Sequence, residues 1–290
     1  MRGATFVGFL AVAMWALLAL LTDSTGDIPA FQLTAMTFVI AALCGMLSWL
    51  FRSGAWRGVL VPLNAWAVGV GGLFGYHFVY FTALENAPAV DASLIAYLWP
   101  LFIVLGSALM PGESLRWHHV AGALLGLAGA AMIVTKGGSV SFEAQYGFGY
   151  AMALGCALLW STYSLLSRRL SHVPTDAVTG FCVVTALLAL LCHLAFEQTV
   201  WPVDTIQWLA VLLLGLLPVG AAFFAWDYGV KRGNIQILGA ASYASPLLST
   251  IVLVLAGRTE LTLSITLACL LITFGAVLAS KDMIFGKVAA

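Results

Sequence analysis

The stretch Tyr97-Leu98-Trp99-Pro100-Leu101 recurs later in the chain as Tyr243-Ala244-Ser245-Pro246-Leu247. The two copies lie about half of the 290-residue chain apart, and the charge upstream of them changes sign. Glu85-Asn86 precedes the first copy, whereas Lys231-Arg232 stands at the same spacing before the second. A repeat with inverted loop charge predicts two homologous halves inserted in opposite directions into one membrane, which is typical of transporters.

The composition places the chain in a membrane. Hydrophobic residues make up 62% of it and charged residues only 8%, against about 25% charged residues in a soluble domain. The net charge is zero and no basic cluster occurs, so we expect no nucleic-acid partner. The cysteines lie in apolar runs without metal-binding spacing, which predicts no disulfide, metal or cofactor; they are Cys44, Cys156, Cys182, Cys192 and Cys269.

Apolar runs predict an all-α polytopic membrane protein with ten spans, because a spanning helix needs about 20 apolar residues. The first run follows Arg2 and resembles a signal peptide, but no small-residue cleavage site follows it, so we count it as a span. The predicted repeats are 1–140 and 141–290, with five helices each. The expected spans are 4–22, 30–50, 64–84, 89–110, 118–135, 148–166, 176–196, 206–229, 235–256 and 263–280.

The basic residues predict the direction of insertion. With the N-terminus inside, ten of the twelve Lys and Arg residues fall on the cytoplasmic side, and only Lys136 and Arg258 fall outside. The positive-inside rule therefore puts both termini in the cytoplasm. Five spans per half is an odd number, so the second half must enter the membrane from the opposite side, as the sign change requires.

Three ionisable residues inside the spans are candidates for function, because a buried charge is costly in a bilayer. Asp91 and Asp227 lie near span ends, where each is either an interfacial acid or a coupling residue; Asp227 also precedes Lys231 by four residues, which favours a pair. His77 lies in mid-span and is either a neutral group bonded within the bundle or a pore-lining, proton-sensing residue. His77 and Asp227 are the candidates for coupling.

Aromatic residues and prolines deep in the spans predict the substrate site. Tyr and Trp normally gather at membrane interfaces, so deep ones need polar partners from other helices or from a solvated cavity. Paired, proline-interrupted spans at matching repeat positions are typical of a transporter's binding site. The predicted substrate-binding residues are Tyr76, His77, Tyr80, Tyr97, Trp99, Pro100, Trp160, Tyr163, Trp226, Ser242, Tyr243 and Pro246. We expect no catalytic and no metal-binding residues.

The first half also resembles a known family. Tyr97-Leu98-Trp99-Pro100-Leu101, then Gly112-Glu113, then Gly122-Ala123-Leu124-Leu125 and Gly129 resemble the EamA-type branch of the drug/metabolite transporter superfamily. The second half departs from this pattern, since Arg258-Thr259-Glu260 replaces the Gly-Glu turn and Ala268-Cys269 replaces a glycine. Within the branch, the chain is most similar to bacterial exporters of aromatic amino acids.

The resemblance implies ten spans in two inverted repeats, a bacterial inner-membrane location and efflux of phenylalanine, tyrosine, tryptophan or related neutral metabolites by alternating access. The implied partners are the lipid bilayer and a small amino-acid-like substrate, and a monomer is compatible with both. Three alternatives stay open: a transporter of another metabolite or drug, a passive channel, and an intramembrane enzyme, although no DDxxD, HExxH or GxGD motif occurs. Proton exchange and facilitated diffusion are both compatible with the sequence.

Overall fold

A computed structural model describes residues 1–138, 142–258, 260 and 262–282. Throughout this part of the chain the secondary structure is helical, with no strand. Nine of its segments are long and apolar enough to cross a membrane, and a tenth apolar helix, α15, has 17 residues. The all-α polytopic fold that the sequence predicts is confirmed.

The observed spans agree with the expected ones to within a few residues. They are α1 with α2 (Arg2–Trp15, Leu18–Asp23), α3 (Ala30–Trp49), α4 with α5 (Leu63–Val70, Tyr76–Asn86), α6 with α7 (Ala89–Ala96, Trp99–Gly106), α8 (Trp117–Val134), α9 (Gly147–Arg169), α10 (Ala177–Phe196), α11 with α12 (Thr205–Leu216, Ala222–Arg232), α13 with α14 (Ile235–Ala241, Ala244–Leu255), and α15 (Leu263–Ala279).

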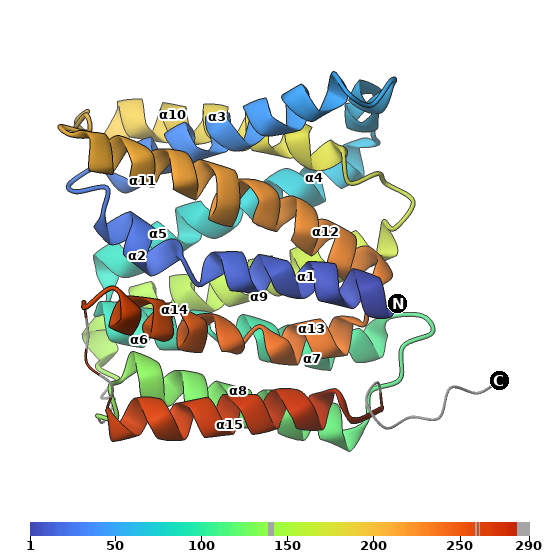
Figure 1. The fold of residues 1–290 in the computed structure, drawn as a ribbon, viewed down its shortest axis with the longest axis vertical. Helices are drawn as coiled ribbons and strands as arrows, with labels where there is room; N and C mark the ends of the chain where they lie inside the picture. Colours follow the sequence, from blue (N-terminus) through green and yellow to red (C-terminus); the bar gives the residue numbers. More distant parts are fainter. Residues whose placement is uncertain (139–141, 259, 261, 283–290) are drawn as a thin grey trace.

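The spans run side by side between two ends of different charge (Figure 1). The end that carries the N-terminus holds Arg2, Arg52, Arg57, Arg116, Arg168, Arg169, Lys231, Arg232 and Lys281, and we call it the basic end. The other end, which we call the acidic end, holds Asp23, Asp27, Glu85, Glu143, Glu197 and Asp204. The charge segregation along the sequence is thus a segregation between the two faces of the bundle.

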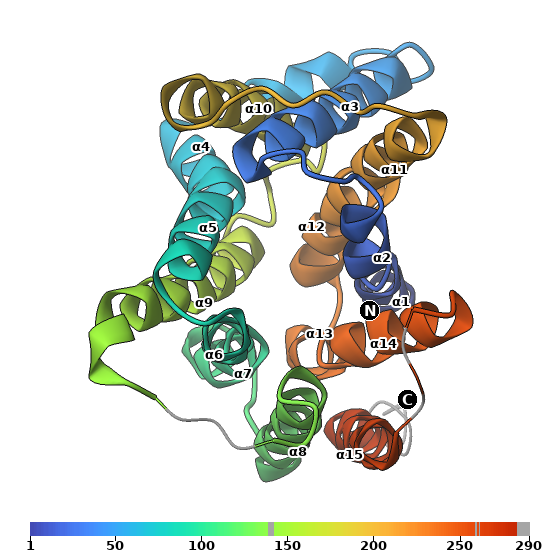
Figure 2. The same ribbon diagram turned by 90° about the vertical axis from the view of Figure 1, so that its left-hand side faces the viewer.

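Spans that correspond in the two halves of the chain face each other. Seen along the helices, α4–α5, α6–α7 and α9 form one wall, and their counterparts α11–α12, α13–α14 and α1–α2 form the other (Figure 2). The remaining counterparts pack in pairs, α3 against α10 and α8 against α15, at opposite edges of the bundle. Each wall therefore combines spans from both halves of the sequence.

Several spans are broken at related positions. Two π-helical turns, Gly71–Gly75 and Leu217–Ala221, stand at the repeat spacing in spans three and eight. Spans four and nine break at Tyr97-Leu98 and at Ser242-Tyr243, just before their prolines. Proline favours the first turn of a helix because it lacks the N–H that the turn leaves unpaired. The first span is also broken, at Ala16-Leu17, which the sequence did not predict.

At the basic end, α1 and α12 approach closely because both helices carry glycine at the crossing. A Cβ at Gly229 would lie 2.5 Å from the Cα of Gly8. Small residues permit this contact between spans, where no hydrophobic force drives association in lipid. The two helices therefore pack directly together where the bundle meets the basic face.

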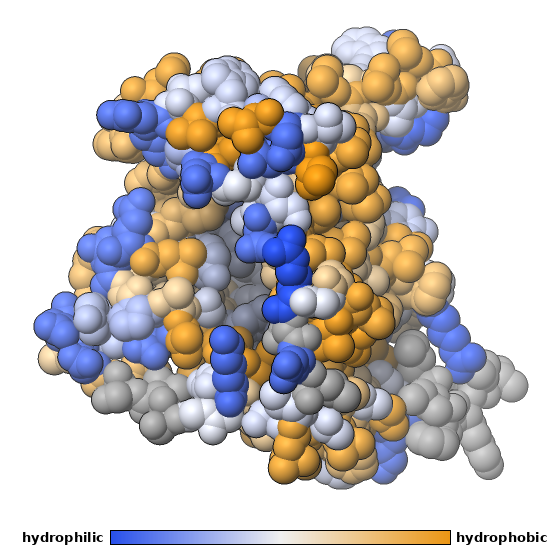
Figure 3. Space-filling model, turned by 60° about the vertical axis from the view of Figure 1, so that its left-hand side comes forward, coloured by the Kyte–Doolittle hydropathy of each residue, from blue (hydrophilic) through white to orange (hydrophobic). Residues whose placement is uncertain are grey.

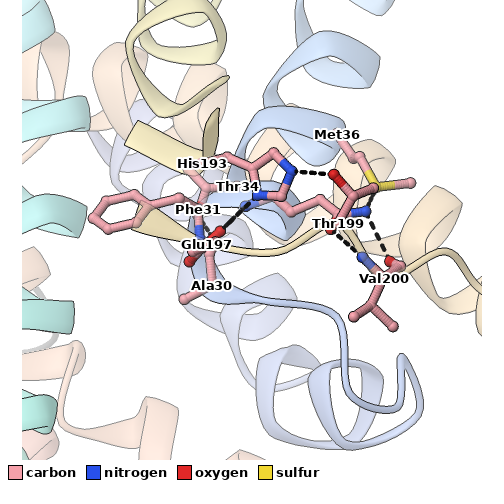
Figure 4. Close-up of polar contacts among 9 residues, drawn as sticks. Ala30, Phe31, Thr34, Met36, His193, Glu197, Thr199 and Val200 are labelled. Atoms are coloured by element: carbon pink, nitrogen blue, oxygen red, sulfur yellow. Dashed lines mark hydrogen bonds and ion pairs between the residues drawn. The ribbon is translucent and has the colours of Figure 1, made fainter. Parts of the chain in front are cut away.

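At the acidic end, a carboxylate from another span caps the start of α3 (Figure 4). Glu197 accepts hydrogen bonds from the backbone N–H groups of Phe31 (2.8 Å) and Gln32 (3.0 Å). Nδ1 of His193 donates to the same carboxylate (2.9 Å), and Nε2 bonds the Thr199 hydroxyl (2.9 Å). Because the first N–H groups of a helix have no partner within it, this contact fixes α3 to α10 and its following loop.

We therefore expect Glu197→Ala to lower the stability of the protein. The variant loses two charge-assisted hydrogen bonds to α3. A hydrogen bond to a charged group contributes about 1.5–3 kcal/mol to the free energy of unfolding. Thermal unfolding in detergent should show a lower midpoint than for the wild type. Glu143→Ala is the matched control, because that glutamate pairs with Gln145 in an exposed loop. Equal midpoints for the two variants would contradict the capping role.

Candidate functional site

A cavity of about 630 Å³ lies between the two walls. Its lining reaches Thr22, Ile28 and Leu84 beside the loops of the acidic end, and Figure 3 shows the hollow on that side of the molecule. Spans one, two, three, four, six, eight and nine all contribute to it. The volume is in the range of small-molecule sites, which usually measure about 300–1,000 Å³. This structure therefore represents a state in which the cavity opens toward the acidic end.

Four aromatic side chains form the floor of the cavity. Trp15, Trp99 and Trp160 meet edge to face, with ring centroids 5.6–6.3 Å apart. Phe223 adjoins Trp160 at 5.8 Å, and Trp226 lies directly beneath the floor, 5.2 Å from Trp15, with no exposed surface. Aromatic rings prefer such offset and perpendicular contacts because their faces are negative and their edges positive. The floor is therefore a packed layer of rings with specific orientations.

Span three supplies one aromatic side wall. Tyr76 and Tyr80 share a face of α5 and stack, with centroids 5.9 Å apart, and Tyr76 also contacts Trp160. The Tyr80 hydroxyl pairs with Ser93 Oγ at 3.2 Å. His77 is both bonded within the bundle and part of the lining: its Nδ1 donates to the Leu73 carbonyl at 2.7 Å. Its Nε2 is thus the ring nitrogen left for a bound molecule.

The cavity offers neutral polar groups but no fixed charge. Among the described residues that line it there is no Asp, Glu, Lys or Arg. Within the same part of the chain, the indole N–H groups of Trp99 and Trp160 make no hydrogen bond, whereas Trp15 Nε1 donates to the Pro218 carbonyl at 3.1 Å. The site can therefore stack an aromatic ring and hydrogen-bond a polar group without pairing it to a fixed ion.

Beneath the floor, buried polar contacts join the two walls. Trp226 Nε1 donates to Ser164 Oγ at 3.1 Å, which connects α12 to α9. Asp227, the next residue of α12, pairs with Lys231 at 2.8 Å and accepts a hydrogen bond from the Thr175 hydroxyl at 2.7 Å. Both charged side chains are at most 4% exposed. The pair that the i, i+4 spacing predicts is confirmed, and it lies inside the bundle.

A second ionic group closes the basic end. Arg168 on α9 forms an ion pair with Glu113, from the loop between α7 and α8, and donates to the carbonyls of Gly233 (2.7 Å) and Val230 (3.1 Å). Gln236 on α13 also donates to Glu113, at 3.0 Å. A cation is favoured at a helix C-terminus, where carbonyls have no partner. These contacts tie α9 and the α7–α8 loop to α12 and α13, so the walls touch at the basic end.

The structure brings half of the predicted substrate-binding residues to the cavity. The lining includes Tyr76, His77, Tyr80, Tyr97, Trp99 and Trp160. The others, which are buried outside the lining, are Pro100, Tyr163, Trp226, Ser242, Tyr243 and Pro246. Asp227, the second coupling candidate, is also outside it.

Two of the buried residues have visible structural contacts. The Tyr243 hydroxyl accepts a hydrogen bond from the backbone N–H of Leu101 at 3.2 Å, in the first turn after the break in span four. Ser242 Oγ donates to the Leu238 carbonyl of its own helix at 2.7 Å. The interpretation of Asp227 as an interfacial acid that reaches water is wrong, because its side chain is 1% exposed; repeat position alone does not report depth within the bundle.

Sequence reasoning missed several residues of the lining, above all Trp15 and Phe223. The signal for Trp15 was its place in the repeat, since the Met14-Trp15 stretch of span one matches the Leu159-Trp160 stretch of span six. Nothing in the sequence indicates that Thr34, Thr37 and Ser249 line the cavity. Hydroxyl residues are common in spans, and the direction of their side chains depends on how the helices pack.

Two further features lie apart from this cavity. A groove of about 750 Å³ between α3, α10 and α11 is lined almost entirely by apolar side chains and offers nothing to orient a polar solute. His118, His119 and Asp282 bring their ligand atoms within 4.8 Å of one another. His119 Nδ1 accepts from the Arg116 N–H, and Asp282 pairs with Arg116 at 3.0 Å. These partners occupy lone pairs that a metal ion would need.

Comparison with known proteins agrees with this architecture. The model of the EamA-like transporter family matches residues 2–135 and again residues 147–281. The chain belongs to the EamA-like transporter family. Two matches in one chain correspond to the two repeats, although the boundary at residue 140 stays a prediction.

Relatives within the family include named exporters. The aromatic amino acid exporter YddG of Ancylobacter novellus is 50% identical over 278 residues, which are 96% of either chain. The protein of the same name from Escherichia coli is 22% identical over 85% of this chain and 86% of its own length. A crystal structure of a protein 48% identical in sequence covers all of both chains with a TM-score of 0.94. The fold of this EamA-type protein is thus the fold of a solved relative.

The state of the cavity predicts which positions a water-soluble thiol reagent reaches. In a background with all native cysteines replaced by alanine, Ser249→Cys should react rapidly with a charged maleimide, because Ser249 lines the open cavity. Ser164→Cys should react slowly, because Ser164 is fully buried beneath the floor. Ser53→Cys, at an exposed loop position, is the positive control. Equal rates at positions 164 and 249 would show that the floor does not seal the cavity.

Proposed function

We propose that this EamA-type transporter exports aromatic amino acids. The observation that carries the proposal is a cavity at the centre of the bundle whose floor and wall are rings, and whose lining in the described residues has no fixed charge. An aromatic amino acid combines an apolar ring with a zwitterionic group of zero net charge. The Ancylobacter novellus relative, named as an aromatic amino acid exporter, supports the same substrate class.

Physical chemistry supports binding of modest affinity. Each favourable ring contact contributes about 0.5–1.5 kcal/mol beyond area burial, and Trp160, Tyr76 and Trp99 present such contacts. The indole N–H groups of Trp99 and Trp160 and the Nε2 atom of His77 are then available to the substrate's carboxylate and ammonium. Neutral partners hold these groups less tightly than ions, which suits release from an exporter.

The proposed orientation places the basic end in the cytoplasm and the acidic end outside. The positive-inside rule supports it, because the basic loops lie at one end of the bundle. In a bacterium, the membrane is then the inner membrane, with both termini cytoplasmic. The cavity of this structure opens outward, and rocking of the two walls would close it there and open it at the cytoplasmic end. A single chain supplies both walls, so the proposal needs no oligomer.

One alternative substrate class has some support. The pseudopaline exporter CntI of Pseudomonas aeruginosa is 27% identical over 75% of this chain, so the family includes exporters of other metabolites. Counterflow of labelled amino acids against a panel of unlabelled amino acids and drugs separates the two classes. Preference for phenylalanine, tyrosine or tryptophan supports our proposal, and preference for a non-aromatic solute contradicts it.

Removing the central ring of the floor should weaken transport. Trp160→Ala removes contacts with six aromatic neighbours that include Trp15, Trp99 and Tyr76. We expect KM for aromatic amino acids in proteoliposomes to rise about tenfold, which corresponds to about 1.4 kcal/mol. Trp201→Ala is the control, because Trp201 is 61% exposed outside the cavity. Wild-type KM in the Trp160 variant would contradict the cavity assignment.

Facilitated diffusion is the proposed mode of transport, because the described lining has no carboxylate that substrate and proton can share. An imposed pH gradient should therefore not drive accumulation of aromatic amino acids in proteoliposomes. Accumulation that disappears in His77→Asn or Asp227→Asn would instead support proton exchange through that residue. Equal pH profiles in wild type and both variants would agree with our proposal.

A further inference from the structure

The inverted repeat indicates which residues line the pathway when the other end opens. In inverted-repeat transporters, alternating access arises as one structural element rocks against the other around a fixed site. If the two halves exchange conformations, each residue that lines the present cavity is replaced by its counterpart in the other half. The spacing between Tyr97 and Tyr243 sets this correspondence, and it pairs the two π-helical turns as well.

The correspondence is informative at span three. Tyr80 and Phe81 on α5 line the cavity now, and their counterparts on α12 are Trp226 and Asp227. Thr22 lines the outer part of the cavity, and at the offset that matches Trp15 with Trp160 its counterpart on α9 is Ser167, next to Arg168. The position that Phe81 occupies in the present cavity is therefore charged in the other half, where Asp227 stands.

The same residues hold the basic end closed in the present structure. Asp227 is paired with Lys231 and with the Thr175 hydroxyl, and Lys231 also donates to the Val173 carbonyl at 3.0 Å. Thr175 and Val173 lie in the loop between α9 and α10, so separating α9 from α12 breaks these two contacts. The i, i+4 pair itself lies within α12 and moves with it. Opening therefore exposes the Asp227 carboxylate and the Lys231 ammonium after both have lost their partners across the interface.

An unsatisfied polar group lies beside the pair. The Tyr163 hydroxyl is buried near Asp227 and Ser167 and has no hydrogen bond of normal geometry. Tyr163 also contacts Trp160, with ring centroids 5.1 Å apart, so it connects the floor of the cavity to the charged pair. A buried polar group without a partner is uncommon and calls for an explanation. The Tyr163 hydroxyl is explained if it lines a pathway that the substrate occupies in another state.

The free-energy cost of burying ions also indicates that the pair of Asp227 and Lys231 has a function. A buried ion pair is weak support for stability, because desolvation offsets the attraction between the charges. Ionisable residues within spans are therefore functional candidates by default. Asp227 and Lys231 lie in the interface that must open, one and two helical turns beyond Phe223 of the floor, which makes substrate recognition the simplest reason for their presence.

We propose that Asp227 and Lys231, with Arg168 across the interface, form a charged subsite for the α-amino and α-carboxyl groups of the substrate in the state open to the basic end. Asp227 receives the ammonium, and Lys231 and Arg168 receive the carboxylate. The inference rests on the proposed function, because it assumes an amino-acid substrate. The substrate then moves from a charged subsite at the basic end to a neutral cavity at the acidic end, and this asymmetry favours capture at one end and release at the other.

The test measures half-saturation separately at the two ends, in right-side-out and inside-out membrane vesicles. For Asp227→Asn, we expect KM at the basic end to rise about tenfold and KM at the acidic end to change less than threefold. The variant should also lose preference for phenylalanine over its deaminated acid at the basic end. Asp91→Asn is the matched control: that acid is buried and bonded to Tyr150, outside the cavity lining, so both constants should stay unchanged.

A second variant separates recognition from folding, because Asp227→Asn leaves Lys231 buried without its partner. Asp227→Asn with Lys231→Met removes both charges and should fold, since replacing a whole buried pair is often tolerated. It should show the same rise in KM at the basic end. Unchanged KM at that end, or an equal rise at both ends, would overturn the proposed subsite.

If the proposed function is wrong, the counterflow measurement gives a different result from the one expected here. In that case wild-type protein does not exchange aromatic amino acids in the counterflow panel at all. The two-ended measurement is then made with the amino acid that the wild type exchanges best, and it tests the charged subsite in the same way.

Discussion

The need to satisfy every backbone polar group within a bilayer is the constraint on which this architecture depends. Water is absent from the hydrocarbon core, so a broken span is tolerated only where another helix or a cavity supplies partners. Span four is broken before Pro100, and the N–H of Leu101 donates to the hydroxyl of Tyr243 from the other half of the chain. The breaks and the contact between halves therefore depend on each other, and the cavity lies where they meet.

The closed end and the open end are held by different kinds of interaction. At the basic end, the walls meet through ions and helix-end carbonyls, as in the contacts of Arg168 with Glu113 and Gly233. At the acidic end, the ordered contacts run between α3 and α10, where Glu197 caps α3 beside the cavity mouth. Polar contacts at helix ends can break and form as the walls move, whereas the floor between them is a packed layer of aromatic rings. This division suits a protein that must open one end at a time.

The sequence predicted only part of the cavity lining, because a repeat identifies corresponding residues but not their exposure. Tyr76, Tyr80 and Tyr97 were predicted from spacing and depth, and all three line the cavity. Trp226 and Tyr243 were predicted from the same repeat, yet they are fully buried outside the cavity lining. Sequence symmetry identifies both members of a counterpart pair, but it does not report which of them reaches the cavity: Trp15 and Trp160 both line it, whereas of Tyr80 and Trp226 only Tyr80 does.

The sequence by itself determined the class of protein, the ten spans, the inverted repeat and the breaks before the paired prolines, because hydropathy, charge bias and prolines act locally along the chain. Only the tertiary structure decided which end is open, that Trp15 and Phe223 belong to the floor, and that Asp227 is sealed with Lys231 inside the bundle. Those features depend on contacts between α9 and α12 and between the two walls. Such contacts join residues far apart in the chain, and their geometry depends on how whole helices pack.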